Sequence, residues 1–267
     1  MVSRPANLHS YNGNLGTLRE SALEMRVRHF GLLILLSITT PKHLTAAETT
    51  TIKYEASYLG ISVLDMTLTW TEDDSVIQVS YDNQLKPYIA RFHTIHNTYR
   101  VQFMRDSFEP LDWSKSISEG KLGFDLSARR TGNGSRVSFS DGSDLTFPSG
   151  AFTIFSATHF LAAKARDPDY FPNTVLVFID GTIWEASASR YDTMNPHPDH
   201  EVNAGEVLIQ ADLHYISGES LVAKNDILTS VIATEGTQFL LWVLPDGSYT
   251  RAQFGKFPKA VLLERIK

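Results

Sequence analysis

The stretch from Val175 to Ala186 reads VLVFIDGTIWEA, and it predicts two β-strands joined by a tight turn. Asp180-Gly181 lies between two runs rich in β-branched and aromatic residues. Both central residues of a type I′ turn need a positive φ, which Asp-Gly tolerates well. A second hairpin, with a longer loop, is predicted around Pro245-Asp246-Gly247-Ser248. These two sites favour a fold built from antiparallel neighbours.

Apolar and polar side chains alternate along much of the remaining chain. Leu64, Met66, Leu68 and Trp70 alternate with polar residues, and the same period recurs over 207–215. Successive side chains of a strand point to opposite faces, so this period predicts strands with one apolar face, as in antiparallel sheets. Further strands are predicted at 51–58, 76–83, 89–96, 99–104, 112–118, 122–129, 135–140 and 260–266.

One segment has the spacing of a helix instead. Residues 152–166 place Ile154, Ala157 and Leu161 close to one helical face. Thr153 or Ser149 could cap its start, and Asp167-Pro168 ends it. We therefore expect one main helix, at about 152–166, covering an apolar face of a mainly β fold.

The N-terminal region has the order of a secretory signal peptide. A basic segment that starts at Met25 precedes the apolar run Phe30–Ile38, and Thr45-Ala46-Ala47 offers a small-residue cleavage site. Residues 25–47 are thus predicted to be a signal peptide. Residues 1–24 are interpreted as an extension from an upstream start codon chosen in error; the alternative is an unusually long basic region. The segment 48–267 is then a single β-rich exported domain.

The composition of the chain excludes several kinds of site and disfavours several kinds of partner. The apolar run is shorter than the roughly 20 residues that span a bilayer, so no stable membrane insertion is expected. The chain has no cysteine, which excludes disulfides, thiolate metal sites and a lipid-anchoring cysteine. Its net charge is −6, and removal of the Arg-containing leader makes it more acidic. Such a charge disfavours binding to nucleic acid.

Several motifs, in order, resemble a bacterial exported family known only as domain of unknown function 3108. The opening segment Ile52–Leu68 is similar to that family's first hairpin, although Leu64 or Asp65 stands where a second glycine is expected. The segment 151–161 is similar to the start of its helix, without the family's arginine at the helix end. Further matches are Phe108-Glu-Pro-Leu, Phe124-Asp125, Leu241–Gly247, Phe254-Gly255-Lys-Phe and Ala260-Val-Leu-Leu.

The resemblance runs from about Ile52 to Ile266 and implies a strongly curved antiparallel sheet or a partly open β-barrel. It implies no established chemistry. Together with the signal peptide, it predicts a soluble periplasmic protein.

One loop contains a cluster of metal-ligating residue types. His197, Asp199, His200 and Glu201 fall within five residues, and imidazole and carboxylate groups are zinc ligands. Prolines flank His197, however, and no spacing such as H-E-x-x-H is present. A solvated loop is therefore the favoured interpretation of 192–204, and no cofactor is expected. His159, inside the predicted helix, is expected to be an ordinary core or rim histidine.

Motifs for catalysis are missing from the sequence. There is no G-x-S-x-G nucleophile elbow, no G-x-G-x-x-G and no Walker pattern. Carboxylates such as Asp125 and Asp212 are plentiful, but nothing in the sequence pairs two of them across a cleft. The chain is therefore expected to be non-catalytic.

Four tryptophans, Trp70, Trp113, Trp184 and Trp242, all lie on predicted strands. If the sheet curls, its concave face could present these rings to an acyl chain or a sugar. The alternative is that each ring fills the core beneath the helix.

Three functions remain open at this point. The favoured one is a periplasmic binding or carrier module for an amphiphile, such as a lipid, or for a cell-envelope glycan. The second is an envelope hydrolase that uses unrecognised carboxylates or the 197–201 cluster. The third is an assembly factor that binds envelope proteins through exposed sheet edges.

Overall fold

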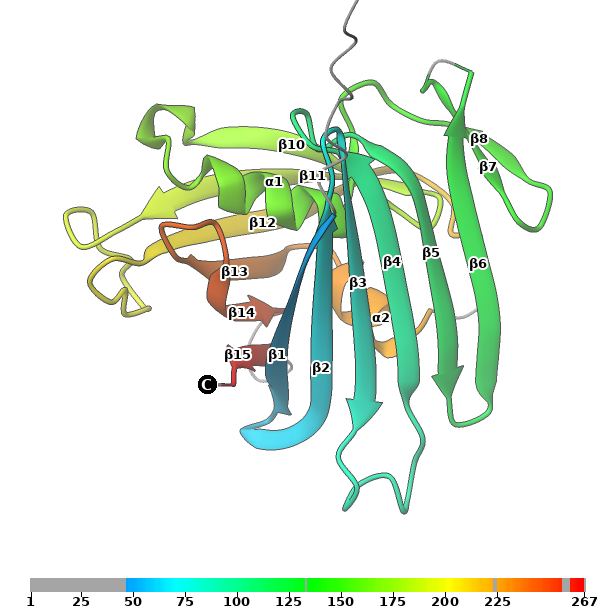
Figure 1. Cartoon of the computed structure of the whole chain (residues 1–267), viewed down its shortest axis with the longest axis horizontal. Helices are drawn as coiled ribbons and strands as arrows, with labels where there is room; N and C mark the ends of the chain where they lie inside the picture. Colours follow the sequence, from blue (N-terminus) through cyan, green and yellow to red (C-terminus); the bar gives the residue numbers. More distant parts are fainter. Residues whose placement is uncertain (1–46, 133, 223–224, 256–259, 267) are drawn as a thin grey trace, which may run out of the picture. The chain divides into compact units, whose positions relative to one another are not determined.

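The computed structural model describes residues 47–132, 134–222, 225–255 and 260–266, shown in Figure 1. The extension 1–24 and all but the last residue of the predicted signal peptide 25–47 lie outside these residues. Fifteen strands among the described residues form one sheet, so the prediction of a mainly β fold is confirmed. The strands are β1 (Glu48–Tyr58), β2 (Ile61–Glu72), β3 (Val76–Leu85), β4 (His96–Met104), β5 (Pro110–Glu119), β6 (Leu122–Thr131), β7 (Arg136–Phe139), β8 (Asp144–Thr146), β9 (Phe152–Thr153), β10 (Asn173–Ile179), β11 (Thr182–Tyr191), β12 (Val207–Gly218), β13 (Thr237–Val243), β14 (Tyr249–Phe254) and β15 (Val261–Arg265).

The strand order places β1 at the middle of the sheet: β8-β7-β6-β5-β4-β3-β2-β1-β15-β14-β13-β12-β11-β10-β9. Neighbours pair antiparallel, except that β9 pairs parallel with β10. The Asp180-Gly181 turn joins β10 to β11 as predicted, with φ of 46° and 99° at its two residues. A Cβ at Gly181 would lie 2.4 Å from the Glu219 carbonyl oxygen. Both this close contact and the positive φ therefore require glycine at this position.

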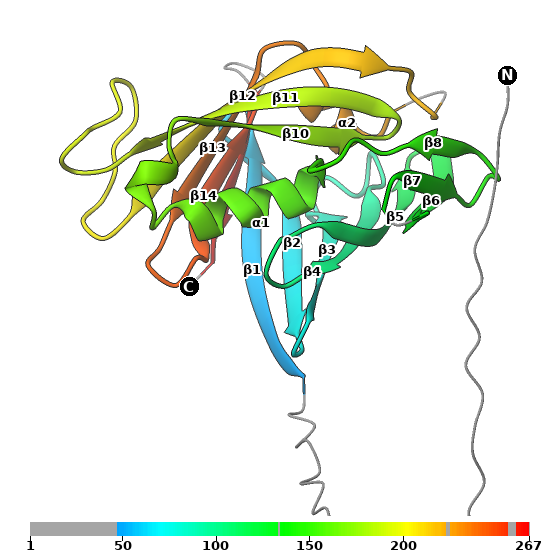
Figure 2. The same ribbon diagram turned by 90° about the horizontal axis from the view of Figure 1, so that it is seen from above.

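The sheet does not close on itself, because β8 and β9 each pair with one strand only among the described residues. Its two halves nevertheless face each other. In Figure 2, helix α1 (Ile154–Lys164) lies between β10–β13 and β2–β4. The largest core cluster accordingly combines residues from both halves with Ala157 and Leu161 of α1.

The helix begins two residues later than predicted, because residues 152–153 form β9. Thr153 is its N-cap, as one of the two predicted caps, and shares a capping box with Ser156. A short 3-10 turn, Pro168–Tyr170, follows it. A second helix, α2 (Ile227–Ile232), was not predicted. No helix within the described part of the chain is long and apolar enough to cross a membrane.

The predicted strand at 89–96 is wrong over most of its length. Residues 87–92 form turns, in which the amides of Ile89 and Ala90 both donate to the Lys86 carbonyl. Pro87 lacks an N–H and fixes its own φ, which favours a turn here over a strand. β4 therefore begins only at His96.

Candidate functional site

A cavity of about 750 Å³ lies between the inner face of the sheet and the two helices. Strands β1–β4 and β13–β15 contribute mainly apolar side chains to its wall. Among them are Leu64, Met66, Phe239 and Leu263. Phe155 from α1 and Ile232 from α2 complete the lining. Binding sites for small molecules commonly measure about 300–1,000 Å³ and are mostly apolar, so this space has the size and character of a ligand site.

The exposed residues of the lining mark the mouth of the cavity. Tyr58, His93, Ile227 and Ser230 line the cavity and are also exposed to solvent. They come from the end of β1 next to the β1–β2 turn, from the β3–β4 loop and from α2. The mouth therefore lies between α2 and two loops, whereas Tyr81 and Leu263 are buried at the inner wall.

Three polar side chains interrupt this apolar wall on neighbouring strands; we call Asn83, Asn97 and Glu119 the polar strip. Asn83 on β3 stands opposite Asn97 on β4. The Asn97 amide nitrogen donates to Glu119 Oε1 at 2.5 Å, and its oxygen accepts from the Ser118 amide. All three residues of the strip are at most 7% exposed.

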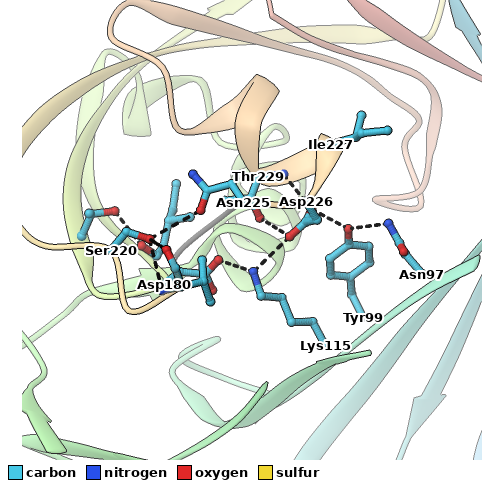
Figure 3. A network of polar contacts seen from close by, with 12 residues as sticks. Asn97, Tyr99, Lys115, Asp180, Ser220, Asn225, Asp226, Ile227 and Thr229 are labelled. Atoms are coloured by element: carbon cyan, nitrogen blue, oxygen red, sulfur yellow. Dashed lines mark hydrogen bonds and ion pairs between the residues drawn. The ribbon is translucent and has the colours of Figure 1, made fainter. Parts of the chain in front are cut away.

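Helix α2 is attached to the sheet through buried charges, shown in Figure 3. Lys115 on β5 reaches between Asp180, from the β10–β11 turn, and Asp226, the N-cap of α2. Its Nζ lies 3.0 Å from Asp226 Oδ2, and it also contacts Asp180. Tyr99 donates to Asp226 Oδ1 at 2.8 Å. We call Lys115, Asp180 and Asp226 the ion cluster.

The two carboxyls of the ion cluster respond differently to burial. Burial raises the pKa of Asp180, in spite of the Lys115 charge beside it. Burial also opposes ionisation of Asp226, but Lys115 and the hydrogen bonds from Thr229 and Tyr99 outweigh it and lower the pKa of that carboxyl. The Lys115 charge and the hydrogen bonds from Thr229 and Tyr99 thus favour the ionised form of Asp226, which caps α2. Glu119 of the polar strip adds a further link, since it accepts from the Ile227 amide at 3.0 Å.

His159 is a core histidine, as predicted. It lies on α1, is 6% exposed, and its Nε2 lies 2.7 Å from the Tyr81 hydroxyl. Burial lowers the pKa of His159 to about 3, so the ring is neutral near pH 7. The buried ring packs against Trp70 at a centroid distance of 4.8 Å.

The four tryptophans all lie on strands, as predicted, but they lie apart and none lines the 750 Å³ cavity. Trp70 lines a second cavity, of about 450 Å³, beside His159. Trp113 packs among Phe139, Phe147 and Phe178.

The other two tryptophans lie on opposite faces of the sheet. Trp184 is 5% exposed and belongs to the inner core. Trp242 packs with Leu208 and Leu240 in a separate cluster, whereas its neighbour Leu241 belongs to the inner core. Trp242 therefore points away from the inner face.

The metal-ligand candidates lie in a loop, as predicted for 192–204. His197 Nε2 lies 2.8 Å from Gln210 Oε1, and its Nδ1 accepts from the Asp199 amide. The His200 ring meets Trp242 edge-on, and the Glu201 carbonyl accepts from the Trp242 indole. Within the described ranges, no group of three or more His, Cys, Asp or Glu side chains is placed to hold a metal ion.

Sequence reasoning missed the polar strip, although a signal for it was present. Asn83 has the same parity as Val79 and Tyr81 on β3, and Asn97 has that of Tyr99 and Val101 on β4. Strand alternation therefore places both amides on the apolar face. Glu119 has no comparable signal, because its role depends on the unpredicted helix α2.

Comparison with known proteins leaves the family of this chain open. No family model matches the chain. No curated protein matches it either. It is similar to a solved structure from Brucella abortus, described as a beta-barrel-like protein of domain of unknown function 1849. The TM-score is 0.48 and the identity 9%, over 83% of this chain and 96% of that chain. Membership of domain of unknown function 3108 stays a prediction.

Proposed function

We propose that this protein is a non-catalytic periplasmic carrier that holds the apolar part of an amphiphile in the 750 Å³ cavity. The cavity itself is the observation that carries the proposal. Its lining has one carboxylate, Glu119, and neither lysine nor arginine among the described residues. An apolar space of this size with a solvent-exposed opening favours a ligand that has a hydrocarbon chain and a small polar group.

Two further features of the proposal rest on the sequence. The segment from Met25 to Ala47 supports export, and N-terminal sequencing of the secreted protein should then begin at Glu48 or a near neighbour. A mature protein that retains residues 1–24 would contradict it. The finer form of the fold, a partly open barrel, is also part of the proposal, because strong curvature would give an open sheet an enclosed inner face.

A neutral fluorescent probe tests the carrier function directly. We expect N-phenyl-1-naphthylamine to bind the purified protein saturably and to be displaced by 1-dodecanol. Met66→Trp would fill part of the cavity and should weaken probe binding, because Met66 lines the wall and is 5% exposed.

Met104→Trp is the matched control, since Met104 is 37% exposed and does not line the cavity. Absence of saturable binding, or equal loss in both variants, would contradict the proposal. If the probe does bind saturably, mass spectrometry of organic extracts from natively purified protein would identify the natural ligand.

A further inference from the structure

Asn83 carries a buried amide that has no hydrogen-bond partner among the described residues. Its side chain is 7% exposed and lines the cavity. No protein group among the described residues forms a hydrogen bond with this amide, although an amide offers two donors and an acceptor. Buried polar side chains are normally hydrogen-bonded, so an amide that faces an empty apolar space points to a bound polar group.

The other two residues of the polar strip, Asn97 and Glu119, already have hydrogen-bond partners in the protein, and Glu119 is a carboxylate. Asn97 uses its nitrogen on Glu119 and its oxygen on the Ser118 amide. Glu119 accepts from Asn97 and from the Ile227 amide, and a carboxylate can accept further hydrogen bonds. A ligand group beside the strip therefore meets the free donors and acceptor of Asn83 and the spare acceptor capacity of Glu119.

The charges around the strip disfavour an anion. Glu119 is the one carboxylate of the cavity lining, and the lining of described residues includes no lysine or arginine to balance it. The nearest cation in the polar network, Lys115, is committed to Asp180 and Asp226. Among the described lining residues, His93 is the one side chain with a basic group, and it lies exposed at the mouth. Burial away from water strengthens the effect of such an unbalanced charge.

The strip also has apolar neighbours on both sides along its strands. Leu85 and Ile95 line the wall towards the β3–β4 loop, and Tyr81 and Tyr99 line it on the inner side. A head group at the strip would thus leave its chain in contact with apolar wall.

We propose that the polar strip binds the head group of the carried amphiphile, and that this head is a hydrogen-bond donor without negative charge: an amine, an amide or a hydroxyl. The inference rests on the proposed carrier function and specifies its ligand class. Free fatty acids and phosphate monoesters are the classes that the strip rejects.

A series of ligands with one chain and different heads tests the inference on the unaltered protein. Displacement of N-phenyl-1-naphthylamine at pH 7 is measured with dodecylamine, 1-dodecanol, dodecanoate and dodecyl phosphate, each below its micellar concentration or, for the alcohol, below its solubility limit. We expect the amine and the alcohol to displace the probe at concentrations at least tenfold lower than the two anions. Displacement by the anions at equal or lower concentrations would overturn the inference.

Two variants locate the preference at the strip. Asn83→Leu should reduce the advantage of 1-dodecanol over the two anions severalfold, with each displacement referred to the probe affinity measured for that same variant. Glu119→Gln keeps an acceptor for Asn97 and Ile227 but removes the charge, and should bring dodecanoate severalfold closer to dodecanol. Gln84→Leu is the control, because Gln84 is the exposed neighbour of Asn83 on the other face of β3.

The outcomes separate this inference from the proposed function. If the probe does not bind the unaltered protein, the carrier function fails, and this inference fails with it. If the probe binds but the head groups are not distinguished, only this inference fails. A preference that survives unchanged in both variants also overturns it, because the discrimination would then arise elsewhere in the cavity.

Discussion

The inner face of the sheet is filled beside one part of α1 and hollow beside α2. In the packed region, aromatic and aliphatic side chains surround Phe103, Ala157 and Leu161, and the buried His159, which also borders the 450 Å³ cavity, is bonded to Tyr81. In the cavity region, Asn83 is similarly buried but has no hydrogen-bond partner in the described part of the chain. Burial of a polar side chain is therefore not enough to assign it to the core. Its bonding decides whether the site is complete without a ligand.

The two helices are held in correspondingly different ways, and this gives the largest expected effect. α1 is held by packing, whereas the short α2 depends on the ion cluster. Lys115→Met leaves Asp180 and Asp226 without their cation, so it should lower the free energy of unfolding by about 3–5 kcal/mol, as removal of one partner from a buried pair usually does.

Urea denaturation measures this loss, and Lys121→Met on the exposed β5–β6 turn is the control. A loss no larger than the control's would show that α2 does not depend on the ion cluster. Adding Asp180→Asn to Lys115→Met should recover part of the loss, since one uncompensated carboxyl is removed.

The bonded histidine of the packed region predicts a pH effect of intermediate size. The folded protein holds His159 neutral because its pKa is lowered from 6.5 to about 3, whereas the unfolded chain takes up a proton below pH 6.5. Stability is therefore complete above pH 6.5 and falls as the pH falls towards 3. Linkage gives a slope of up to about 1.4 kcal/mol per pH unit, or roughly 2–3 kcal/mol between pH 6.5 and 4.5.

The contribution is isolated by comparison with His159→Gln, which should lack it. Carboxyl groups common to both proteins cancel in the difference between their unfolding free energies. Parallel pH dependence in the two proteins would contradict a neutral, buried His159.

A matched pair of alanine substitutions compares the filling of the two regions. Ala157 on α1 and Ala56 on β1 are both 3% exposed, but only Ala56 lines the cavity. Ala157→Leu should cost about 1–3 kcal/mol, because extra methylene groups overpack a filled core. Ala56→Leu should cost less and should weaken N-phenyl-1-naphthylamine binding. Equal costs, measured by urea denaturation, would mean that the cavity does not accommodate the added side chain.

The smallest effect is expected at the mouth. Phe92, in the β3–β4 loop, is 88% exposed, so Phe92→Ser should change the free energy of unfolding by less than about 0.5 kcal/mol. A larger loss would indicate that the loop is part of the packed fold and not a free rim.

The sequence predicts the strands better than the hollow they surround. Alternation and the Asp180-Gly181 turn act locally, so most strands and both hairpins follow from them. The prediction fails where an apolar run is broken by Pro87, and where the six apolar and hydroxyl residues of α2 have no helical pattern of their own.

The site is harder to predict for a physical reason. A cavity remains where inward-pointing side chains do not contact one another. The packing between strands that are distant in the sequence decides where that happens. Trp184 and Asn83 both point inward from strands of the same sheet, yet only Asn83 lines the 750 Å³ cavity. Residue type favoured the tryptophans as binding residues, whereas the structure places all four outside the lining of the 750 Å³ cavity and Trp70 in that of the 450 Å³ cavity.

The strand order has a consequence for how the protein folds. Every neighbouring pair in the sheet joins consecutive strands, except that β1 pairs with β15, for example Tyr54 with Arg265. Each half can therefore form by zipping local hairpins, which have a low entropic cost of loop closure. The seam between β1 and β15 requires closure of nearly the whole described chain. We expect it to form last and to govern the rate of folding, while the cavity, which takes residues from both sides of the seam, exists only after that step.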